Sequence, residues 1–426
     1  ERLARLRHTP AVTLDGEKIE LLANIEMPED AAAALATGVV GVGLFRSEFL
    51  FMGRQGNLPD EQEQYAAYRR AVEGMNGLPV TIRTVDVGAD KPLDEARHDA
   101  AHLNPALGLR AIRWSLSEPS MFRRQLRARL LADPPSLFMG VDAPDFNLDL
   151  AADLKSAGIP AVQFVCPSVW AWRPERVVKI ARSVDHVLCL FPFEPDLLRH
   201  HGIDATFVGH PLASVIPLQP DRLAARRQLG LDPKVPVLAV LPGSRASEVK
   251  YLAERFLCAA RLLAQRHPGL QVVLPVAGGL RAQVEQIVAR VGAVPGLQLI
   301  DGQSHAVLAA CDLTLVASGT ATLEAALFKR PMVIAYNMHP VSWWLMRGKK
   351  LQPWVGLPNI LAGEFVVPEL LQDQATPQAL ADALHDWLEQ PQKAAQLQQR
   401  FEAMHHSLTR DTARSCADAI EKILAR

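Results

Sequence analysis

The sequence has few cysteines, almost no net charge and no long apolar run. The net charge of −1 argues against a nucleic-acid binder that depends on phosphate contacts. No apolar run approaches the roughly 20 residues that span a bilayer, and the N-terminus lacks the apolar stretch of a signal peptide. The five cysteines include no CxxC pair and no zinc-like spacing, and most lie in apolar runs: Cys166, Cys189, Cys258, Cys311 and Cys416. This pattern indicates buried, reduced thiols and a cytosolic compartment.

What the sequence does contain is an alternation of short apolar runs with helical patterns. At 426 residues, of which 49% are hydrophobic, the chain is long enough for two or three domains. Helical patterns separate most of the predicted strands, which is typical of a doubly wound α/β fold with more than one sheet. Three helices are predicted over 376–425. Beyond about residue 129 the predicted strands are 136–141, 160–165, 186–190, 206–208, 236–241, 271–276, 297–300, 313–317 and 332–336.

Two of these strands end in a turn of small polar residues that leads into a helix. One unit lies within 235–275 and reads VPVLAVLPGSR before a helical pattern over 247–267, and the other lies within 313–331 and reads LTLVASGTATLEAAL. Such turns present backbone N–H groups at the positive end of a helix, at the sheet edge where ligands bind. Two of them in one sheet predict a ligand that carries a diphosphate. The turn residues are Gly243, Ser244, Arg245, Ser318, Gly319 and Thr320.

Upstream of about residue 129 the pattern is again α/β, but the motifs are different. Short buried strands are predicted at 21–25, 39–44 and 80–86, with helical patterns at about 29–36 and 61–75. The motifs resemble phosphoenolpyruvate–protein phosphotransferase, enzyme I of the bacterial sugar phosphotransferase system, over about residues 1–127. They read LLANIEMPEDAAAALATGVVGVGLFRSEFLFM, LPDEQEQYAAYRRAV, VTIRTVDVGADK and NPALGLRAIR. The resemblance implies the opening of a (βα)8 barrel that binds phosphoenolpyruvate.

The same resemblance gives a role to two arginines. Arg46 and Arg83 match arginines that hold the phosphate or carboxylate of phosphoenolpyruvate, and guanidinium forks suit those anions. Without the family match, both would be interpreted as surface residues near strand ends. Only about three of the barrel's eight strands are present, and His8, His98 and His102 lie in surroundings unrelated to the phospho-accepting motif. We therefore predict a vestigial phosphoenolpyruvate site without phosphotransferase activity.

After a seam at 125–129 the motifs change again. FRRQLRARLLADPP predicts a basic helix that ends at Pro134 and Pro135. The motifs beyond it resemble lipid-A-disaccharide synthase over residues 129–426. They read LFMGVDAPDFNLDLA, FVCPSVWAWRPERVVKI, VDHVLCLFPFE, FVGHPL, LAVLPGSRASEV, VASGTATLEAAL and GLPNILAG. The resemblance implies a GT-B architecture, which is a pair of Rossmann-like domains with the active site between them.

The two resemblances together predict four domains. The first is a partial (βα) barrel over 1–128, and the second is an N-terminal GT-B domain over 129–208 that lacks its first strand–helix units. The third is a C-terminal GT-B domain over 209–405 that binds the nucleotide sugar, and the fourth is a helix within 406–426 that packs back on the sheet.

Two residues are candidates for catalysis. Asp142 ends the strand LFMGVD, where a carboxylate points into the crevice and can serve as a general base. The resemblance also places the catalytic aspartate there. The alternative is a helix cap, although Asp145 or Asn147 fits that role better. Arg245 is suited to stabilising the phosphate charge of a UDP leaving group, and its alternative is a surface arginine paired with Glu248.

The nucleotide of the donor is expected to lie against both turns. Gly243, Ser244 and the Ser318–Thr320 turn supply small donors for phosphate. Glu324 would accept hydrogen bonds from the ribose hydroxyls, as the resemblance implies, with a solvated helical glutamate as the alternative. Asn359 matches a family motif and is expected to line the donor site. Because the sequence has no DxD triad, we expect arginine and backbone amides to neutralise the phosphate without a metal ion. No cofactor is expected.

The segment 339–359 interleaves aromatic and basic residues. Aromatic side chains belong at the headgroup level of a membrane and basic residues pair with anionic lipid, while a buried aromatic cluster is the competing interpretation. Elsewhere, Trp170 and Trp172 favour packing, and His210 is either in an interdomain linker or a satisfied loop histidine. The candidate membrane residues are Trp343, Trp344, Arg347, Lys349 and Lys350.

The resemblance implies an inverting glycosyl transfer in lipid A biosynthesis. UDP-2,3-diacylglucosamine would donate its sugar to the 6-hydroxyl of 2,3-diacylglucosamine 1-phosphate, with release of UDP. The enzyme would be cytoplasmic and peripheral on the anionic inner face of the inner membrane of a Gram-negative bacterium. Two alternatives stay open: a fragment of a phosphoenolpyruvate-dependent phosphotransferase, and an inactive hybrid of two incomplete folds with exposed strand edges.

Overall fold

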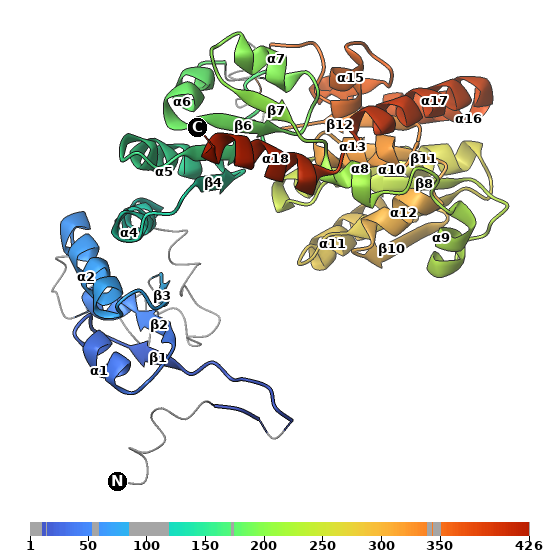
Figure 1. Cartoon of the computed structure of the whole chain (residues 1–426). Coiled ribbons are helices and arrows are strands. Elements are labelled where there is room, and N and C mark those ends of the chain that lie inside the picture. The colour runs from blue at the N-terminus through green and yellow to red at the C-terminus, as the bar shows by residue number, and fades with distance from the viewer. Residues whose placement is uncertain are drawn as a thin grey trace. The chain divides into compact units, whose positions relative to one another are not determined.

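The computed structural model describes residues 11–13, 15–52, 59–84, 119–171, 174–338, 343 and 351–425. Within these ranges the chain is a mixed α/β protein with three sheets of three, six and four strands (Figure 1). This confirms the predicted fold class. The chain divides into two compact units, one formed by 1–165, 178–187 and 422–426 and the other by 166–177 and 188–421.

The larger unit is built on the six-stranded sheet, in the order β10-β9-β8-β11-β12-β13. Neighbouring strands are parallel throughout. β8 and β11 are buried along their whole length, as expected for a parallel sheet covered on both faces. The strands are β8 (Val237–Leu241), β9 (Gln271–Val276), β10 (Leu297–Asp301), β11 (Leu313–Ala317), β12 (Met332–Tyr336) and β13 (Glu369–Leu371).

All but one of these strands match the prediction to within one residue. The exception, β13, was missed because a three-residue strand that starts with a glutamate forms no apolar run. The three predicted C-terminal helices are confirmed as α16, α17 and α18. The helices are α8 (Pro211–Val215), α9 (Arg222–Leu229), α10 (Ala246–Arg266), α11 (Arg281–Val291), α12 (Ser304–Ala310), α13 (Thr320–Leu327), α15 (Leu357–Ala362), α16 (Pro377–Glu389), α17 (Pro391–Leu408) and α18 (Thr412–Leu424).

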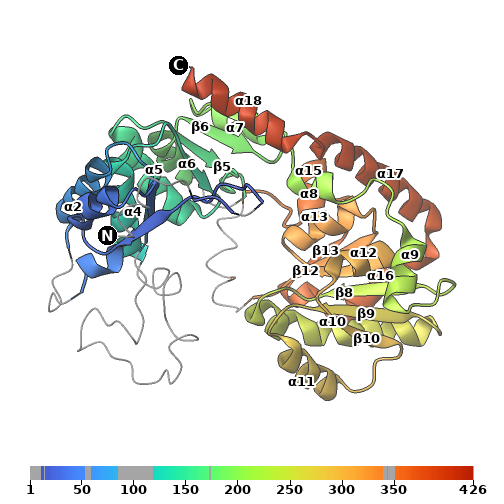
Figure 2. The ribbon, with the colours of Figure 1, turned by 60° about the horizontal axis from the view of Figure 1, so that its bottom comes forward.

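Helices cover both faces of the six-stranded sheet. α10 packs against α11 and α16, whereas α12 packs against α9 and α13, and the two groups lie on opposite faces (Figure 2). The helices α10 and α13 make the crossover connections β8–α10–β9 and β11–α13–β12, and β8 and β11 pair in parallel. As a result, the carboxyl ends of β8 and β11 lie side by side at one edge of the sheet.

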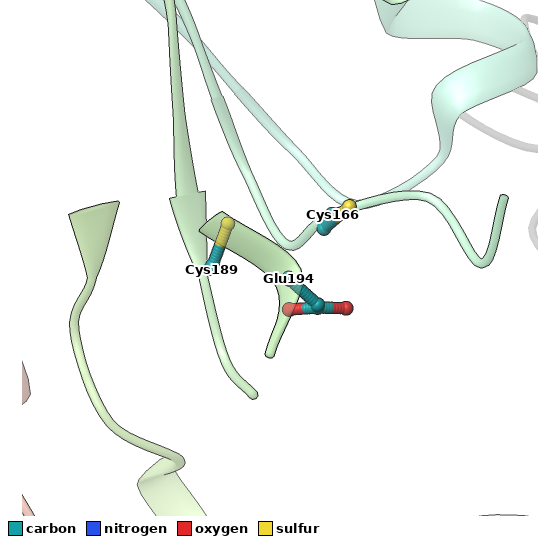
Figure 3. A group of neighbouring side chains, drawn as sticks. All are labelled: Cys166, Cys189 and Glu194. Atoms are coloured by element: carbon teal, nitrogen blue, oxygen red, sulfur yellow. The ribbon is translucent and has the colours of Figure 1, made fainter. Parts of the chain in front are cut away.

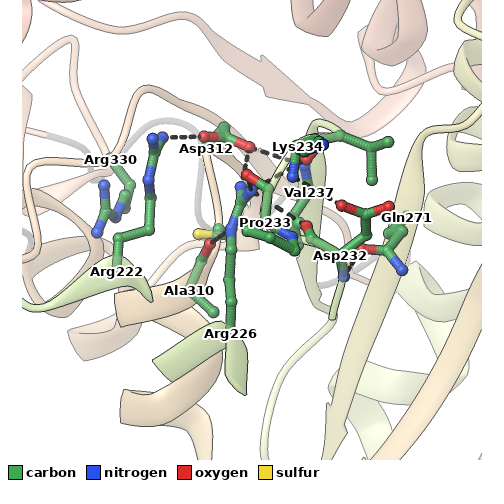
Figure 4. A network of polar contacts seen from close by, with 12 residues as sticks. Arg222, Arg226, Asp232, Pro233, Lys234, Val237, Gln271, Ala310, Asp312 and Arg330 are labelled. Carbon is green, nitrogen blue, oxygen red and sulfur yellow. Dashed lines mark hydrogen bonds and ion pairs between the residues drawn. The ribbon is translucent and has the colours of Figure 1, made fainter. Parts of the chain in front are cut away.

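A buried arginine fixes the other end of β8. Arg226 on α9 is 2% exposed, and its Nη2 pairs with Asp312 Oδ2 at 2.5 Å (Figure 4). Asp312 Oδ2 also accepts from the backbone N–H of Val237, the first residue of β8, at 2.8 Å. The remaining guanidinium donors satisfy the carbonyl groups of Asp232, Pro233, Val235 and Ala310. The start of β8 is therefore held by charge-assisted hydrogen bonds.

The smaller unit contains the parallel three-stranded sheet β1-β2-β3. A helix, α4, packs against α2 and also against α5. The predicted seam lies inside α4, so this helix joins the two segments that resemble different families. The elements are β1 (Leu22–Ile25), α1 (Asp30–Ala36), β2 (Gly41–Arg46), α2 (Glu61–Gly74), β3 (Val80–Arg83), α4 (Pro119–Ala132) and α5 (Pro144–Ser156).

The four-stranded sheet has the order β4-β5-β6-β7. β4 and β5 pair in parallel, with Phe138 opposite Ala161. The predicted strands of this region are confirmed: β4, β5 and β6 are shorter than predicted, and β7 has the predicted length but begins one residue earlier. The elements are β4 (Phe138–Val141), β5 (Ala161–Phe164), α6 (Arg176–Ser183), β6 (His186–Cys189), α7 (Glu194–Arg199) and β7 (Ala205–Phe207).

Candidate functional site

A pocket of about 480 Å³ lies at the carboxyl edge of the six-stranded sheet. This volume is in the range of small-molecule sites. The pocket is formed by the turn after β8, the turn after β11 and the ends of β9 and β10. Both predicted turns therefore line one cavity. The lining residues that carry polar side chains or turn glycines are Gly243, Ser244, Arg245, Glu248, Gly302, Ser304, Ser318, Gly319, Thr320 and Glu324.

The turn after β8 holds a carboxylate against its backbone. Glu248 Oε2 accepts hydrogen bonds from the backbone N–H groups of Ser244 at 3.0 Å and Arg245 at 3.3 Å. Gly243 has φ +120°, and a Cβ added there would lie 2.4 Å from Glu248 Oε2. A glycine is therefore required at this position both by its backbone conformation and by the close approach of the carboxylate.

Arg245 lies at the N-cap of α10, beside the pocket. Its side chain is 79% exposed, and Nη1 pairs with Glu248 Oε1 at 2.8 Å. The pairing with Glu248 considered in the sequence analysis is thus present. An exposed guanidinium in such a pair is held weakly, because solvent screens it, and it can turn towards an anion in the pocket.

The turn after β11 is tied to a neighbouring loop. Ser318 Oγ donates to the carbonyl of Val355 at 2.8 Å, and Thr322 Oγ1 accepts from the backbone N–H of Leu357 at 3.2 Å. Gly319 has φ +143° at the N-cap of α13, a conformation that favours glycine. The hydroxyl of Ser318 therefore holds the loop, whereas the backbone of the turn borders the pocket.

Glu324 also borders the pocket, from the first turns of α13. One of its carboxylate oxygens lies 3.7 Å from Nε2 of His305 on α12. His305 was not identified from the sequence, because a lone histidine in a helix gives no motif. Glu248 was recognised only as a pairing partner, although its position three residues after the N-cap is the usual signal of a capping box.

Asn359, which was expected to line the donor site, is not among the residues that line the pocket. Its side chain is fully buried. The amide nitrogen donates to Glu369 Oε1 at 2.8 Å, and Oδ1 accepts from the backbone N–H groups of Val366 and Val367. Glu369 in turn accepts from the backbone N–H groups of Val355 and Gly356. Asn359 thus shapes the loop that Ser318 contacts.

Asp142 belongs to the other compact unit. It follows β4 directly, its side chain is exposed, and Asp142 and Ala143 have φ of +49° and +39°. Two consecutive left-handed residues other than glycine store strain, a feature that concentrates at functional sites. The side-chain amides of Asn147 and Gln163 both donate hydrogen bonds to the backbone carbonyl of Asp142. These two bonds hold the turn in place. No side-chain cap is present on α5, so Asp142 does not cap this helix.

Two cysteines and a glutamate gather in the core of the larger unit (Figure 3). Ligand atoms of Cys166, Cys189 and Glu194 lie within 4.8 Å of one another. The carboxylate oxygens of Glu194 accept from Trp170 Nε1 and from the backbone N–H of Phe191, both at 3.0 Å. The hydrogen bond with Cys166 and burial raise the pKa of Cys189. These features describe a buried structural cluster, and all five cysteines are free.

Packing also accounts for Trp170 and His210. Trp170 lies edge-on to Phe191 and Phe193, in agreement with the predicted packing role, whereas Trp172 lies outside the described residues. His210 is buried, accepts from the backbone N–H of Leu212 at 3.2 Å and contacts the Phe191 ring. It is therefore a satisfied histidine at the N-cap of α8.

The two arginines of the N-terminal segment are both engaged by carboxylates. Arg46 pairs with Glu26 at 2.7 Å, and Arg83 pairs with the buried Glu48. Of the candidate membrane residues, only Trp343 is among the described residues, and it is half-buried. Trp344, Arg347, Lys349 and Lys350 lie outside the described residues. In the part of the chain that the structure describes, no helix is both long and apolar enough to cross a membrane.

The paired Rossmann-like sheets and the pocket at the strand ends define a GT-B-like α/β protein. A family model described as lipid-A-disaccharide synthetase matches residues 105–423. The lipid-A-disaccharide synthase of Verminephrobacter eiseniae is 62% identical over 307 residues, which cover 71% of this chain and 79% of that protein. That of Albidiferax ferrireducens is 62% identical over 306 residues, with the same coverage. The chain therefore belongs to the lipid-A-disaccharide synthase family and is a hexosyltransferase of lipid A biosynthesis.

Two further comparisons concern the N-terminal segment and the fold. A family model described as the PEP-binding domain of PEP-utilising enzymes matches residues 1–139, which confirms the predicted N-terminal resemblance. This match overlaps the synthetase match over 105–139, a stretch that includes the predicted seam. The UDP co-structure of S. aureus MnaA is 14% identical, covers 73% of this chain and 82% of that chain, and has a TM-score of 0.52. It is similar in fold.

Proposed function

We propose that this chain transfers the sugar of UDP-2,3-diacylglucosamine to the 6-hydroxyl of 2,3-diacylglucosamine 1-phosphate, with inversion and release of UDP. The observation that carries the proposal is the pocket in which two strand–turn–helix units meet. Two helix N-termini and one exposed guanidinium there match the charge of a diphosphate. The pocket would hold UDP, and the sugar would extend from it towards the acceptor.

The residues of the pocket take separate parts in this reaction. Arg245 would leave Glu248 and stabilise the negative charge that develops on the departing diphosphate. The backbone of Gly243, Ser244, Gly319 and Thr320 would bind the phosphate oxygens, and Glu324 would accept hydrogen bonds from ribose. Asn359 would act indirectly, through the loop that contacts Ser318. The phosphate charge is met by these groups without a metal ion.

Asp142 would take the proton of the acceptor hydroxyl. Its exposed side chain at the end of β4 and its strained backbone support this role. Replacing Asp142→Asn should lower the rate by about 10²-fold or more, the usual contribution of a general base. Asp145→Asn is the matched control, an aspartate three residues further along the chain, in the first turn of α5. An unchanged rate in D142N would refute the assignment.

The test of the donor site is the release of UDP by the purified chain supplied with both acylated substrates. Arg245→Ala should lower kcat by about 10²-fold, which is typical for the loss of one donor to a transition-state oxyanion. Arg281→Ala is the matched control, because Arg281 also forms an exposed pair with a glutamate at the start of a helix, with Glu285 at 2.7 Å. Equal rates for R245A and R281A would overturn the role of Arg245.

The segment around Trp343 would place the enzyme at an anionic membrane surface, on the cytoplasmic face of the inner membrane. Aromatic and basic residues together favour such a surface. Replacing both Trp343 and Trp344 by Ser should move the protein from vesicles with anionic lipid to the soluble fraction. Val215→Ser, which removes an exposed apolar side chain elsewhere, should leave the partition unchanged. Equal partition of the tryptophan variant and the wild type would refute the membrane role.

A further inference from the structure

The pocket that should bind a diphosphate already contains an anionic group. The charged residues that line it are Arg245, Glu248 and Glu324, so the lining carries two carboxylates and one guanidinium. An anionic ligand would meet a net negative lining unless one carboxylate moved away. Glu248 is the group that can move, because it lies in the first turn of α10 and its side chain is partly exposed.

The contacts of Glu248 are those expected of a bound phosphate. Its Oε2 accepts from two successive backbone N–H groups of the turn, and its Oε1 accepts from the Arg245 guanidinium. Backbone N–H groups at the positive end of a 21-residue helix, together with an arginine, are the donors that phosphate oxygens use. One carboxylate therefore engages all three donors at once.

We propose that Glu248 is an internal placeholder that occupies the phosphate position of the empty pocket and is displaced by the diphosphate of the donor. This inference rests on the proposed donor site. The displacement frees Arg245 and the two N–H groups in a single movement, so that the guanidinium faces the diphosphate only when a nucleotide is bound. Gly243 leaves room for the carboxylate, since any Cβ there would meet it.

The experiment measures the affinity of the full chain for UDP and for uridine by calorimetry. Glu248→Gln keeps an oxygen that can cap the helix but removes the charge. If Glu248 competes with phosphate, E248Q should bind UDP about fivefold to tenfold more tightly, the effect of removing a charge at about 4 Å. The gain should shrink at high salt, and uridine, which lacks phosphate, should bind equally well to both proteins.

Glu285→Gln is the matched control, since it breaks a similar exposed Arg–Glu pair on α11, outside the pocket. Its affinity for UDP should equal that of the wild type. If E248Q instead binds UDP more weakly or equally, the placeholder role is refuted, because Glu248 would then position Arg245 or only cap the helix. If the wild type binds no UDP at all, the proposed donor site itself fails, and the two failures are distinguishable.

A second inference comes from the opposite end of α10. His267 follows this helix, and His385 and Glu389 lie one turn apart on α16. His267 Nε2 lies 2.9 Å from His385 Nδ1, and ligand atoms of all three side chains lie within 4.8 Å of one another. The two histidines are half-buried and Glu389 is exposed, so one side of the cluster faces solvent.

We infer that these three side chains bind a divalent transition metal of the zinc class and link α10 to α16. Two imidazoles and a carboxylate are ligands that Zn²⁺, Co²⁺ and Ni²⁺ accept, and the open side leaves room for water.

Calorimetry with Co²⁺ and with Zn²⁺ tests this site. The wild type should bind one ion, and Zn²⁺ should raise the melting temperature, because it cross-links two helices of one unit. His267→Ala and His385→Ala should each weaken binding at least tenfold, and Glu389→Gln should weaken it less. His406→Ala, at an exposed histidine outside the cluster, is the control. Binding that H267A and H385A leave unchanged would show adventitious metal only and overturn the inference.

Discussion

At the scale of single residues, the buried carboxyl of Glu194 makes stability depend on pH. Burial raises its pKa from about 4.5 to about 7. Between these values the folded chain binds the proton that the unfolded chain has lost, so this group favours folding less and less as pH rises from 4.5 to 7. Below pH 4.5 both states are protonated and the group has no further effect on the pH dependence.

Glu194→Gln removes this titration. The free energy of unfolding of E194Q, relative to the wild type, should therefore rise by about 2 kcal/mol from pH 5 to pH 7.5. Urea unfolding at the two pH values measures the difference. His210 has the opposite effect on the pH dependence of stability, because burial lowers its pKa to about 4. Its contribution is the same in both proteins and cancels in the difference between them. The prediction would be contradicted if E194Q and the wild type differed in free energy of unfolding by the same amount at pH 5 and at pH 7.5.

At the scale of elements, a pair of polar side chains connects the strand β13 to the helix α15 and the loop before it. The pair is Asn359 on α15 and Glu369 on β13. The Asn359 amide donates to Glu369 Oε1 at 2.8 Å, where both groups are shielded from solvent. Asn359→Asp would replace this donor by a second carboxylate and leave the Glu369 oxygen facing a like charge. We expect a loss of about 2–4 kcal/mol in the free energy of unfolding.

Asn359→Asp should also raise the KM for the nucleotide sugar. The loop that it disturbs contains Val355, and the carbonyl of Val355 accepts a hydrogen bond from Ser318 beside the pocket. Adding Glu369→Gln to Asn359→Asp returns a donor to the pair and should restore part of the lost stability. Chemical denaturation of the two single variants and the double variant gives the coupling energy. Additive losses would show that the two side chains do not act as a pair.

The elements of the larger unit could be predicted from sequence, but the partners of their side chains could not. Apolar runs and turn residues placed β8 and β11 and their two turns, because buried parallel strands are continuous in sequence. Glu248 was not recognised as a pocket residue, and Asn359 was assigned to the pocket. For both residues, the position of the side chain depends on its hydrogen-bond partners rather than on the motif in which it lies. Asn359 reaches Val366, Val367 and Glu369 through a loop whose path no local pattern encodes.

At the scale of the whole molecule, both candidate arginines of the N-terminal segment are already paired with carboxylates of the same segment. Arg46 and Arg83 are paired with Glu26 and Glu48, and a bound anion would have to displace both carboxylates. We predict no saturable heat on titration of the purified chain with phosphoenolpyruvate and no phosphate transfer to it. Labelled phosphoenolpyruvate tests the transfer directly. Incorporation of label that Arg46→Ala and Arg83→Ala abolish would contradict the prediction.

The edge of the four-stranded sheet has a consequence for the state of the chain in solution. Among the described residues β4 is an end strand of its sheet, and its Met139 and Val141 side chains are 40% and 57% exposed. An exposed apolar edge strand offers unpaired backbone groups to another chain. We therefore predict association that grows with concentration, as measured by sedimentation velocity.

Replacing both Met139 and Val141 by Lys should suppress this association, because charged side chains on an edge strand oppose pairing with a second edge. Val215→Lys is the control, since Val215 is 69% exposed on the helix α8 and offers no strand edge. The lysine variant of β4 should keep the UDP affinity of the wild type, because the pocket belongs to the other compact unit. A wild-type chain that stays monomeric at all concentrations would show that the edge of β4 is already protected.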